Sequence, residues 1–430
     1  MGVKFVSLFS GGMGLDLGLE MAGFEPSVYV ESNLEAVQTI KLNRPSLPGL
    51  GDITHVSGEE LRSLGKLDGE IALIAGGPPC QAFSVFGKRE GINDIRGQLV
   101  FQFIRLIDEL RPHVFIMENV RGLLSMPIIP CSKKSVPEID YSPEYYAHGS
   151  LLRLILSKFQ EIGYHVDCYV VNAVNYGAPQ IRERLICIGN RHNLVSNFPS
   201  PRYSNRVEDN LPPFKTLGEV IGAGFVDPCP EVLDFSPRKL RYLSLIPPGG
   251  NWRSLSVEIQ KESMGKSWYL KGGRSAYWRK LSFAFPSPTV VTMPNHAGTS
   301  MCHPTELRAI SVGEAAAIQE FPLDWRFAGS TGAKFRQIGN AVPTRLGKVA
   351  GEVVVELLHN IETGLGNKAE EQQMSRIIHL RPHVRTRSFW RNGRVYAGDT
   401  SYYTDEEEDG EENELVTGKD TNQLQLQLEL

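Results

Sequence analysis

One cysteine in this sequence stands where a buried structural cysteine is not expected. Cys80 follows Gly76-Gly-Pro-Pro, directly after the apolar run Ile71–Ala75. Two prolines stiffen a turn and fix the direction of the side chain that follows them. A thiol attacks as its thiolate, and a free thiol of pKa near 8.5 is only ~3% thiolate at pH 7. Cys80 is therefore a candidate nucleophile that needs help from its surroundings to ionise.

A carboxyl group ends another apolar run. Glu118-Asn119-Val120 completes the run Val114–Glu118. Burial in a closed site raises the pKa of a carboxyl group, and only a raised pKa lets it act as an acid near neutral pH. The alternative interpretation is that Glu118 simply caps the next turn.

Two arginines lie close together in Gln180-Ile-Arg-Glu-Arg184, just before a further apolar run. Side chains at positions i and i+2 of an extended segment point to the same side, so Arg182 and Arg184 are expected to face one site. The alternative is surface salt bridging, with Glu183 on the opposite side.

A glycine-rich turn, Phe9-Ser-Gly-Gly-Met-Gly14, separates the first apolar run from an amphipathic segment. Glycines let a backbone approach a ligand closely, and the start of a helix presents free amides. Glu31 ends the second apolar run, where an acid can bind ribose hydroxyls, and Asp52 suits a purine amino group. The turn indicates a nucleotide-like cofactor, and a looser spacing of glycines (12, 14 and 18) leaves a nicotinamide enzyme open.

These groups need a sheet to bring them together. Apolar runs predict strands over Lys4–Phe9, Ser27–Glu31, Ile71–Ala75, Val114–Glu118, His165–Asn172 and Leu185–Asn190. Apolar residues at helical spacing predict helices over 99–110, 152–162, Val312–Ile318 and Leu346–His359. This alternation predicts an α/β domain with a mostly parallel sheet covered on both faces. Ligands of such sheets bind outside the carboxyl ends of the strands, where every motif named above lies.

The pattern of apolar residues, the composition and the charge divide the chain into four parts. Residues 1–190 alternate regularly, with an expected surface insertion at Pro127–Gly149. Residues 191–300 are irregular and rich in Pro, Gly and Ser, 301–360 return to regularity, and 361–430 form a C-terminal extension that we expect to be partly disordered. A linker is expected at 362–375, then six arginines (376, 381, 385, 387, 391, 394) and the acidic run Asp405–Glu414.

Residues 190–300 carry 14 Lys and Arg against 8 Asp and Glu, with thirteen aromatic residues between them. A basic, aromatic-rich stretch suits phosphates and unstacked bases, although an ordinary solvated surface is the alternative. The arginine cluster of the extension either adds nucleic-acid contacts or is an ordinary appendage.

Composition excludes several classes of protein. The chain is 41% hydrophobic and 22% charged, and no apolar run approaches the roughly 20 residues that cross a bilayer. Its six cysteines form no CxxC pair and no regular spacing, which argues against a zinc site and a disulfide framework. We expect a cytoplasmic protein with no membrane contact and no bound metal.

The order of the motifs resembles the cytosine-5 DNA methyltransferase family, of the bacterial restriction–modification type. FSGGMG, GDIT, GGPPCQAFS, ENV, QIRERL, QEFP and QIGNAVP follow one another from residue 4 to about 360, interrupted by the variable stretch. Each motif alone is weak or moderate, but their joint order is very specific. The resemblance implies a Rossmann-like sheet that binds S-adenosylmethionine and a smaller, irregular target-recognition domain at 191–300.

The resemblance also implies roles for individual residues. Cys80 is expected as the nucleophile, Glu118 as the acid that meets ring nitrogen 3 of cytosine, and Arg184 as the contact to its carbonyl oxygen. Arg182 and Asn119 are expected as supporting residues, Ser84–Gly97 as a mobile closing loop, and Val290–Pro304 as the end that recognises DNA. The implied cofactor site comprises Phe9, Gly11, Gly14, Glu31, Asp52, Ile53, Pro79, Leu99, Asn340 and Val342.

One departure from the family pattern is Met13-Gly14, where the family usually has a Gly pair. We expect Met13 to narrow the cofactor turn, which bears on the affinity for the cofactor and not on its identity. The expected partner is double-stranded DNA, bound by a monomer, with a possible cognate restriction endonuclease that acts on the same site.

Three alternatives remain. An amino-group methyltransferase needs a polar residue before Pro-Pro-aromatic, which Leu211-Pro-Pro-Phe and Ile246-Pro-Pro-Gly lack. A tRNA cytosine-5 methyltransferase of the same family is the second, and the basic stretch 191–300 favours duplex DNA over it. A non-catalytic DNA-binding relative is expected to have lost Cys80, Glu118 or Arg184, and all three are present.

Overall fold

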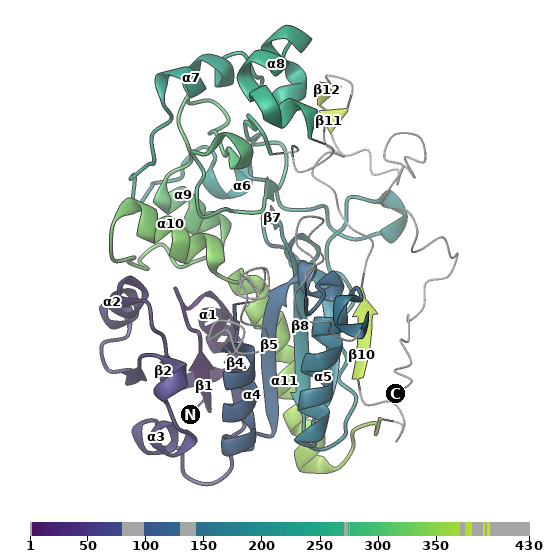
Figure 1. Ribbon diagram of the computed structural model, residues 1–430. Helices are drawn as coiled ribbons and strands as arrows, with labels where there is room; N and C mark the ends of the chain where they lie inside the picture. The colour runs from purple at the N-terminus through teal and green to yellow at the C-terminus, as the bar shows by residue number, and fades with distance from the viewer. Residues whose placement is uncertain are drawn as a thin grey trace.

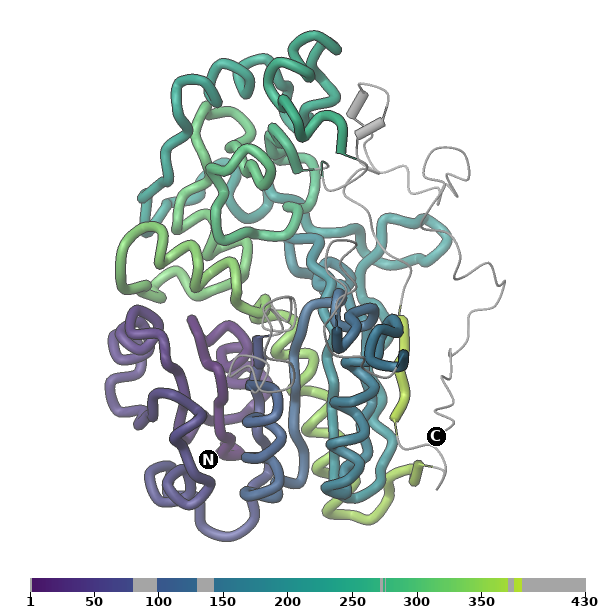
Figure 2. The backbone as a smooth tube through the Cα atoms, viewed as in Figure 1, coloured from purple at the N-terminus to yellow at the C-terminus, as the bar shows by residue number. Residues whose placement is uncertain are grey.

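The computed structural model describes residues 2–79, 99–129, 143–270, 274, 276–369 and 375–380, with the backbone alone of 390–391 and 394–395 (Figures 1 and 2). Cys80, the expected closing loop Ser84–Gly97, most of the arginine cluster and the acidic run Asp405–Glu414 lie outside these residues. Within them, no helix has the length and apolar character that crossing a membrane requires.

One eight-stranded sheet organises the lower part of the molecule in Figure 1, with the strand order β10-β6-β8-β5-β4-β1-β2-β3. Neighbouring strands are parallel except β8, which runs antiparallel to both β5 and β6. The strands are β1 (Val3–Leu8), β2 (Phe24–Val30), β3 (Gly49–Leu50), β4 (Leu73–Gly76), β5 (Val114–Val120), β6 (His165–Asn172), β8 (Glu183–Asn190) and β10 (Ser375–His379). All six predicted strands are confirmed, as is the mostly parallel sheet.

Helices cover both faces of the sheet. One face packs against α3 (Gly58–Leu64), α4 (Leu99–Leu110) and α5 (Ser150–Glu161). The other packs against α1 (Gly14–Met21) and α11 (Thr344–Thr363). Figure 1 shows α4 and α5 on one side of the strands and α11 on the other. This is the α/β layering that the alternation of strands and helices predicts.

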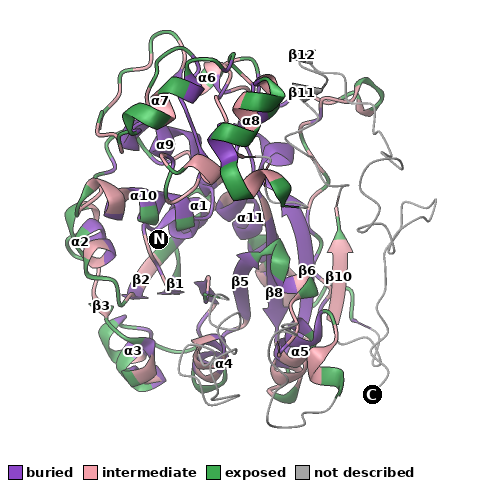
Figure 3. Cartoon of the chain, turned by 45° about the horizontal axis from the view of Figure 1, so that its top comes forward, coloured by how far each residue is buried: buried purple, intermediate pink, exposed green. Residues whose placement is uncertain are grey.

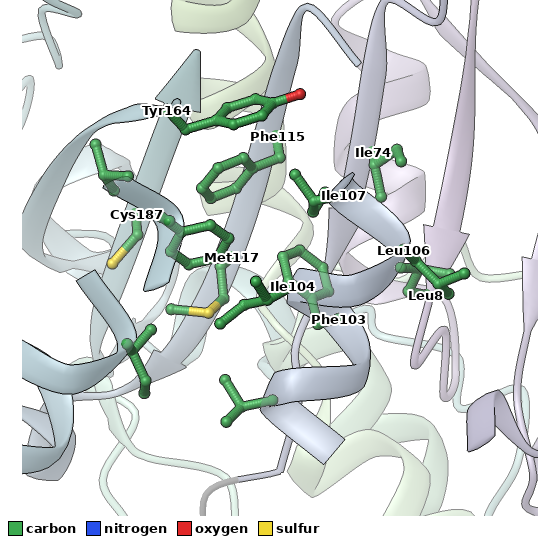
Figure 4. Packing of buried hydrophobic residues seen from close by; sticks show 14 of the residues in the cluster. Leu8, Ile74, Phe103, Ile104, Leu106, Ile107, Phe115, Met117, Tyr164 and Cys187 are labelled. Carbon is green, nitrogen blue, oxygen red and sulfur yellow. The ribbon is translucent and has the colours of Figure 1, made fainter. Parts of the chain in front are cut away.

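The central strand β5 shows why this sheet is buried on both sides. Phe115 and Met117 face the side of α4, whereas Val114 and Ile116 face the side of α11. Successive side chains of a strand point to opposite faces, so a strand covered on both faces must be apolar throughout. Figure 4 shows Phe103 and Ile107 of α4 directed at the aromatic ring of Phe115. The rings of Phe103 and Phe115 meet edge to face, with centroids 6.0 Å apart.

The C-terminal extension contributes β10, which sequence analysis missed. β10 pairs in parallel with β6 at the edge of the sheet. Arg376 donates from Nε to Asp167 Oδ1 at 2.6 Å, so this member of the arginine cluster is bound into the sheet edge. Ile377 and Ile378 pack on opposite faces of the sheet. Only two adjacent apolar residues lie in this strand, which is too few for a strand pattern in the sequence. The predicted linker at 362–375 overlaps the first residue of β10.

The upper part of the molecule is irregular, as expected from residues 191–300 (Figure 2). Its short elements are α6 (Gly218–Ile221), α7 (Pro237–Leu243), α8 (Val257–Met264), β7 (Gln180–Ile181) and β9 (Ser287–Pro288). Beside it lie α9 (Val312–Ile318) and α10 (Thr331–Asn340), and α2 (Leu34–Asn43) faces α10 from the sheet side. One apolar cluster joins Leu217, Val290 and Met301 to residues of α1, β2 and α2, so the irregular region shares part of its core with the sheet.

Many aromatic side chains of the basic stretch serve as core. Phe235, Tyr242, Trp252 and Trp278 are all buried in one apolar cluster. Figure 3 shows buried residues inside this region, while the outer faces of α7 and α8 are exposed. The count of aromatic residues is therefore weaker support for base stacking than it first suggests, because these four rings stabilise the irregular region itself.

Candidate active site

Five parallel strand ends meet at one edge of the sheet. β3, β2, β1, β4 and β5 are parallel neighbours in that order, so their carboxyl ends lie side by side. This edge holds the turn after β1, Glu31, Asp52, the prolines after β4 and Glu118. The structure thus brings together motifs that lie more than 100 residues apart in the sequence, as the general rule for open parallel sheets predicts.

Glu118 and Arg184 form a buried ion pair across two strands. Glu118 Oε1 lies 2.7 Å from Arg184 Nε, and each residue is less than 10% exposed. The two residues are diagonal neighbours on the antiparallel pair β5 and β8, in which Glu118 lies opposite Ile186 and Val120 lies opposite Arg184. Burial raises the pKa of Glu118, while the guanidinium of Arg184 acts against that rise. Surface salt bridging, the alternative for Arg184, is wrong, since the pair is buried.

Asn119 ties the strand of Glu118 to the proline turn. Its side-chain amide donates to the carbonyl oxygen of Pro78 at 3.0 Å, and its Oδ1 accepts from Val120 N at 2.9 Å. Both Asn119 and Pro78 are buried, whereas Pro79 is exposed at the edge. Asn119 therefore holds the turn that leads to position 80. Its expected role as a supporting residue of the site stays a prediction.

Arg182 makes contacts that the sequence did not predict. It is 1% exposed, and its guanidinium donates to three backbone carbonyls, those of Val290, Gly339 and Ala341, at 2.7 to 3.0 Å. The surface alternative is wrong for this arginine too. Its Nη1 and Nη2 donate to distant backbone segments, whereas the Nε of Arg184 pairs with Glu118.

The turn after β1 is held open by a carboxylate. Glu31 Oε2 accepts from Gly11 N at 2.7 Å, and its Oε1 accepts from Asn33 N at 2.7 Å. Phe9 adopts a φ of 56° and Gly11 a φ of 52°. A positive φ is strained for a residue with a side chain, and such strain is concentrated at functional sites. Glu31 thus shapes the turn, and each carboxylate oxygen can accept a further bond.

Of the other expected cofactor residues, Ile53 and Leu99 share an apolar cluster with Phe9. Asp52 is exposed after β3, and its Oδ1 accepts from both the backbone and the hydroxyl of Thr54 at 2.9 Å. These bonds lower its pKa. Ile53 is buried, Leu99 is half-buried at the start of α4, and Asn340 is exposed at the end of α10. Exposed acceptors beside apolar walls are what a nucleoside needs.

Gly14 serves helix packing. A Cβ on Gly14 would stand 2.4 Å from the carbonyl oxygen of Val342, and one on Gly18 would stand 2.3 Å from that of Thr344. No side chain fits at such distances, so these glycines let α1 pack against the start of α11. The structure shows this packing role for Gly14, and its expected place in the cofactor site stays a prediction. This packing accounts for two of the three glycines, Gly14 and Gly18, whose spacing left a nicotinamide enzyme open.

Met13 does not narrow the turn. It is fully buried in the apolar cluster with Leu17, Tyr29 and Ile338, so its side chain points into the protein interior. Its backbone has a φ of 65°, in the left-handed region that favours glycine. The expectation of a narrowed cofactor site was wrong, because the Cα–Cβ bond of residue 13 is directed at the core.

Met13→Gly is expected to lower stability without improving cofactor binding. Truncation of a buried Met costs about 2–5 kcal/mol, and glycine regains about 1 kcal/mol from the positive φ. We therefore expect the free energy of unfolding in urea to fall by about 1–4 kcal/mol, with cofactor affinity measured by calorimetry within about twofold of the parent. A clear gain in affinity without loss of stability would restore the narrowing hypothesis.

Asp16 is a buried acid beneath the turn, which sequence analysis did not single out. It lies in the first turn of α1, and its Oδ1 has no hydrogen-bond partner among the described residues. Burial raises its pKa from 3.8 to about 7, and the nearby carboxylates of Glu20 and Glu31 add to the rise. A hydrogen bond with Ser7 opposes it. Near neutral pH this side chain is therefore poised between its neutral and charged forms.

Asp16→Asn is expected to flatten the dependence of stability on pH. A carboxyl whose pKa is raised on folding stabilises the native state below its unfolded pKa, and that stability is lost as pH rises through the folded pKa. Here the loss runs from about pH 4 to pH 7, and it amounts to roughly 4 kcal/mol at most. Urea midpoints at pH 5 and pH 8 measure it. The parent should lose stability between these two pH values and the Asp16→Asn variant much less; equal losses would contradict the assignment.

The residues of this edge fit S-adenosylmethionine. Glu31 and Asp52 supply carboxylates at the ends of neighbouring parallel strands, the positions from which acids bind hydroxyl and amino groups of nucleosides. The set is completed by the backbone of the turn, where Phe9 and Gly11 both have a positive φ, and by the exposed side-chain amide of Asn340. The two charged members of this set, Glu31 and Asp52, are both acidic, so neither repels the positively charged sulfonium of the cofactor.

Comparisons with known proteins agree with the geometry. The family model described as C-5 cytosine-specific DNA methylase matches residues 3–356. The Type II methyltransferase M.PspPI of Psychrobacter sp. is 38% identical over 363 residues, which cover 83% of this chain and 80% of the relative. The Type II methyltransferase M.Sau96I of Staphylococcus aureus is 36% identical over 351 residues, or 82% of this chain and 75% of the relative.

A solved structure shares the fold. The crystal structure of a putative DNA modification methyltransferase encoded within a prophage of E. coli superposes with a TM-score of 0.56 at 25% identity. The match covers 83% of this chain and 99% of the other. The family match ends at residue 356, before β10, so the strand contributed by the C-terminal extension lies outside it.

Proposed function

Because the chain belongs to the C-5 cytosine-specific DNA methylase family, we propose that it methylates carbon 5 of a specific cytosine in double-stranded DNA through base flipping and covalent attack by Cys80. The single observation that carries the proposal is the buried Glu118–Arg184 pair beside the Pro78–Pro79 turn. That arrangement supplies an acid and a cation next to the turn that Cys80 directly follows in the sequence.

Covalent attack is required because carbon 5 of cytosine is a poor nucleophile. The Cys80 thiolate adds to carbon 6 of a flipped-out cytosine, and the bond between carbons 5 and 6 loses its double-bond character. Flipping comes first, at a cost of a few kcal/mol of unstacking, because a stacked base hides its ring carbons. Electron density then develops at nitrogen 3 and at carbon 5.

Glu118 and Arg184 stabilise this charge. The burial that raises the pKa of Glu118 favours a carboxyl group that donates a proton or hydrogen bond to ring nitrogen 3. Arg184 Nε pairs with the carboxyl of Glu118, and its Nη1 donates to the backbone carbonyl of Glu183. A guanidinium fixed in this way can also donate to the carbonyl oxygen of the base. Asn119 keeps the turn before Cys80 in register with Glu118.

S-Adenosylmethionine, when bound, supplies a methyl group on a positively charged sulfur, which carbon 5 accepts. Glu31 and Asp52 would hold its ribose and purine ends, with Phe9, Gly11, Ile53, Pro79, Leu99, Asn340 and Val342 around it. Loss of the carbon 5 proton and departure of the Cys80 thiolate then restore the aromatic ring. None of these steps by the chain's own residues requires a metal.

The remaining parts of the proposal concern partners. The basic stretch at 190–300, with 14 Lys and Arg against 8 Asp and Glu, supports phosphate contacts with duplex DNA, and Val290–Pro304 is proposed to read base edges. We propose a monomer in a bacterial cytoplasm that protects DNA from a cognate restriction endonuclease, as the Type II names of its relatives suggest.

Bisulfite sequencing of DNA from cells that express the protein tests the proposal. We expect cytosines within one short sequence to resist conversion, and all others to convert. DNA with no protected cytosine would contradict the proposal. Parallel sequencing of tRNA from the same cells separates the alternatives, because protection in tRNA alone would assign the chain to the other substrate.

A further inference from the structure

Three buried polar side chains join the sheet to the irregular region. Gln180, Arg182 and Gln319 are each no more than 1% exposed. Figure 1 shows β7, which carries Gln180, between the upper ends of β5 and β8 and the irregular part of the molecule. Polar groups buried this deeply are costly unless they are hydrogen-bonded. We refer to these three residues as the buried joint.

Gln180 links two chain segments to its own strand. Its side-chain nitrogen donates to Gln319 Oε1 at 2.6 Å and to the carbonyl of Ile318 at 3.2 Å. Its side-chain oxygen accepts from Val290 N at 3.2 Å. The backbone of β7 also pairs with β9, in the register Gln180–Ser287 and Ile181–Pro288. The segment leading into Val290 is therefore fixed by both backbone and side-chain bonds.

Gln319 and Arg182 reach the segment that carries Asn340. Gln319 donates to the carbonyls of Ile338 at 2.6 Å and Ala341 at 3.1 Å. Arg182 donates to Ala341 at 2.9 Å and to Gly339 at 2.7 Å, and through its other nitrogen to Val290 at 3.0 Å. The carbonyl groups of the residues on both sides of Asn340 thus accept from the same guanidinium that donates to Val290.

These segments also touch directly. A Cβ on Gly339 would stand 2.7 Å from the nitrogen of Thr292, so the two backbones pack without an intervening side chain. Arg182 lies two residues before Arg184, which pairs with Glu118. One compact cluster therefore contacts the strand of the proposed catalytic pair, the start of the proposed recognition end and the expected cofactor segment.

We infer that the buried joint is a positioning device that sets the proposed recognition end at Val290 and the segment 339–341 relative to the catalytic strands, and that it thereby determines discrimination between target sequences. The inference rests on the proposed function. Arg182 is suited to this task because a planar guanidinium serves three acceptors in fixed directions, whereas a lysine ammonium on a flexible stem cannot. Loss of one such donor leaves buried carbonyls without partners, and the segments must shift to find others.

The test compares duplex binding by the parent and by Arg182→Lys. One duplex contains the site found by bisulfite sequencing, and the other contains that site with one base pair replaced. Fluorescence anisotropy gives the ratio of the Kd for the altered duplex to the Kd for the intact site. We expect the ratio to fall about tenfold in Arg182→Lys, the effect of one or two lost charged hydrogen bonds. Arg62→Lys is the matched control, because Arg62 donates to the carbonyls of Gly69 and Leu110 far from the site, and its Kd ratio should stay at the parent value.

A purely structural role predicts a different result. Arg182→Lys would then lower the urea midpoint and leave the Kd ratio within about twofold of the parent, which would overturn the inference.

If Arg182→Lys does not fold, Gln319→Met is measured in the same way, since it removes only neutral hydrogen bonds at nearly the same side-chain volume. A parent protein that methylates no DNA would count against the proposed function, whereas a methylating parent with unchanged ratios in both variants would count against the buried joint alone.

Discussion

Replacement of Cys80 by serine is expected to abolish methyl transfer while leaving DNA binding largely intact. A serine hydroxyl has no accessible anion at neutral pH, so carbon 6 would lose its nucleophile. Removal of the nucleophile from other covalent enzymes costs on the order of 10⁶ in rate, and we expect a loss of at least about 10⁴ here. Transfer of a labelled methyl group to duplex DNA measures the rate, and gel shift measures binding.

Cys229→Ser provides the matched control for this substitution. Cys229 is a half-buried cysteine near Glu231, away from the edge of the sheet that carries Glu118. The Cys229→Ser protein should methylate at close to the parent rate. Methylation by Cys80→Ser within about tenfold of the parent would remove Cys80 from the mechanism, and the buried Glu118–Arg184 pair would need another explanation.

Glu118→Gln is expected to slow methyl transfer by about 10²–10⁴-fold, the usual contribution of a positioned general acid. The amide keeps the shape of the side chain and can still accept from Arg184, so the fold should survive. It cannot supply a proton to ring nitrogen 3, and it leaves the charge of Arg184 unbalanced in a buried site. Single-turnover rates with saturating DNA and cofactor isolate the chemical step.

The control for Glu118 is an acid on the neighbouring strand that does not take part in the pair. Glu183 lies 3.4 Å from Arg121, and we expect Glu183→Gln to retain most of the single-turnover rate. A Glu118→Gln protein whose only defect is weaker DNA binding would contradict the proposed acid role. It would instead make Glu118 a residue that organises Arg184.

The strands of the sheet, and the edge at which the sequence motifs meet, were predictable from the sequence alone. Each of the six runs rich in Val, Ile and Leu became a strand, because a strand buried on both faces has almost no choice but apolar residues. Glu118, Asn119 and Arg184 were recognisable because polar residues at the ends of such runs interrupt a strong pattern. Their buried contacts place Glu118 beside Arg184 and tie Asn119 to the proline turn, whereas the roles expected of them in catalysis stay predictions.

Long-range packing accounts for what the sequence did not reveal. Met13 stands in a glycine-rich turn, yet only the three-dimensional structure shows that its side chain enters a cluster with Ile338. Gly14 is required by the carbonyl of Val342, more than 300 residues away along the chain. β10 exists because β6 offers it a partner and Asp167 neutralises Arg376. No local pattern carries these facts.

The buried joint illustrates the same limit for function. Gln180 and Arg182 were visible as part of QIRERL, and Gln319 as the first residue of QEFP. Of the three, only Arg182 was expected to face a site or to form surface salt bridges, and the two glutamines were given no role. The partners of Arg182 are backbone carbonyls of segments 108 to 159 residues away, which only a folded chain can bring within reach.

The most direct test of covalent attack by Cys80 uses duplex DNA in which the target cytosine is replaced by 5-fluorocytosine. Fluorine takes the place of the proton that must leave carbon 5, so the sulfur–carbon bond cannot be released after methyl transfer. With cofactor present, mass spectrometry should find a stable protein–DNA adduct, and peptide mapping should place it on Cys80. An active protein that forms no adduct, or forms it through another residue, would contradict the account.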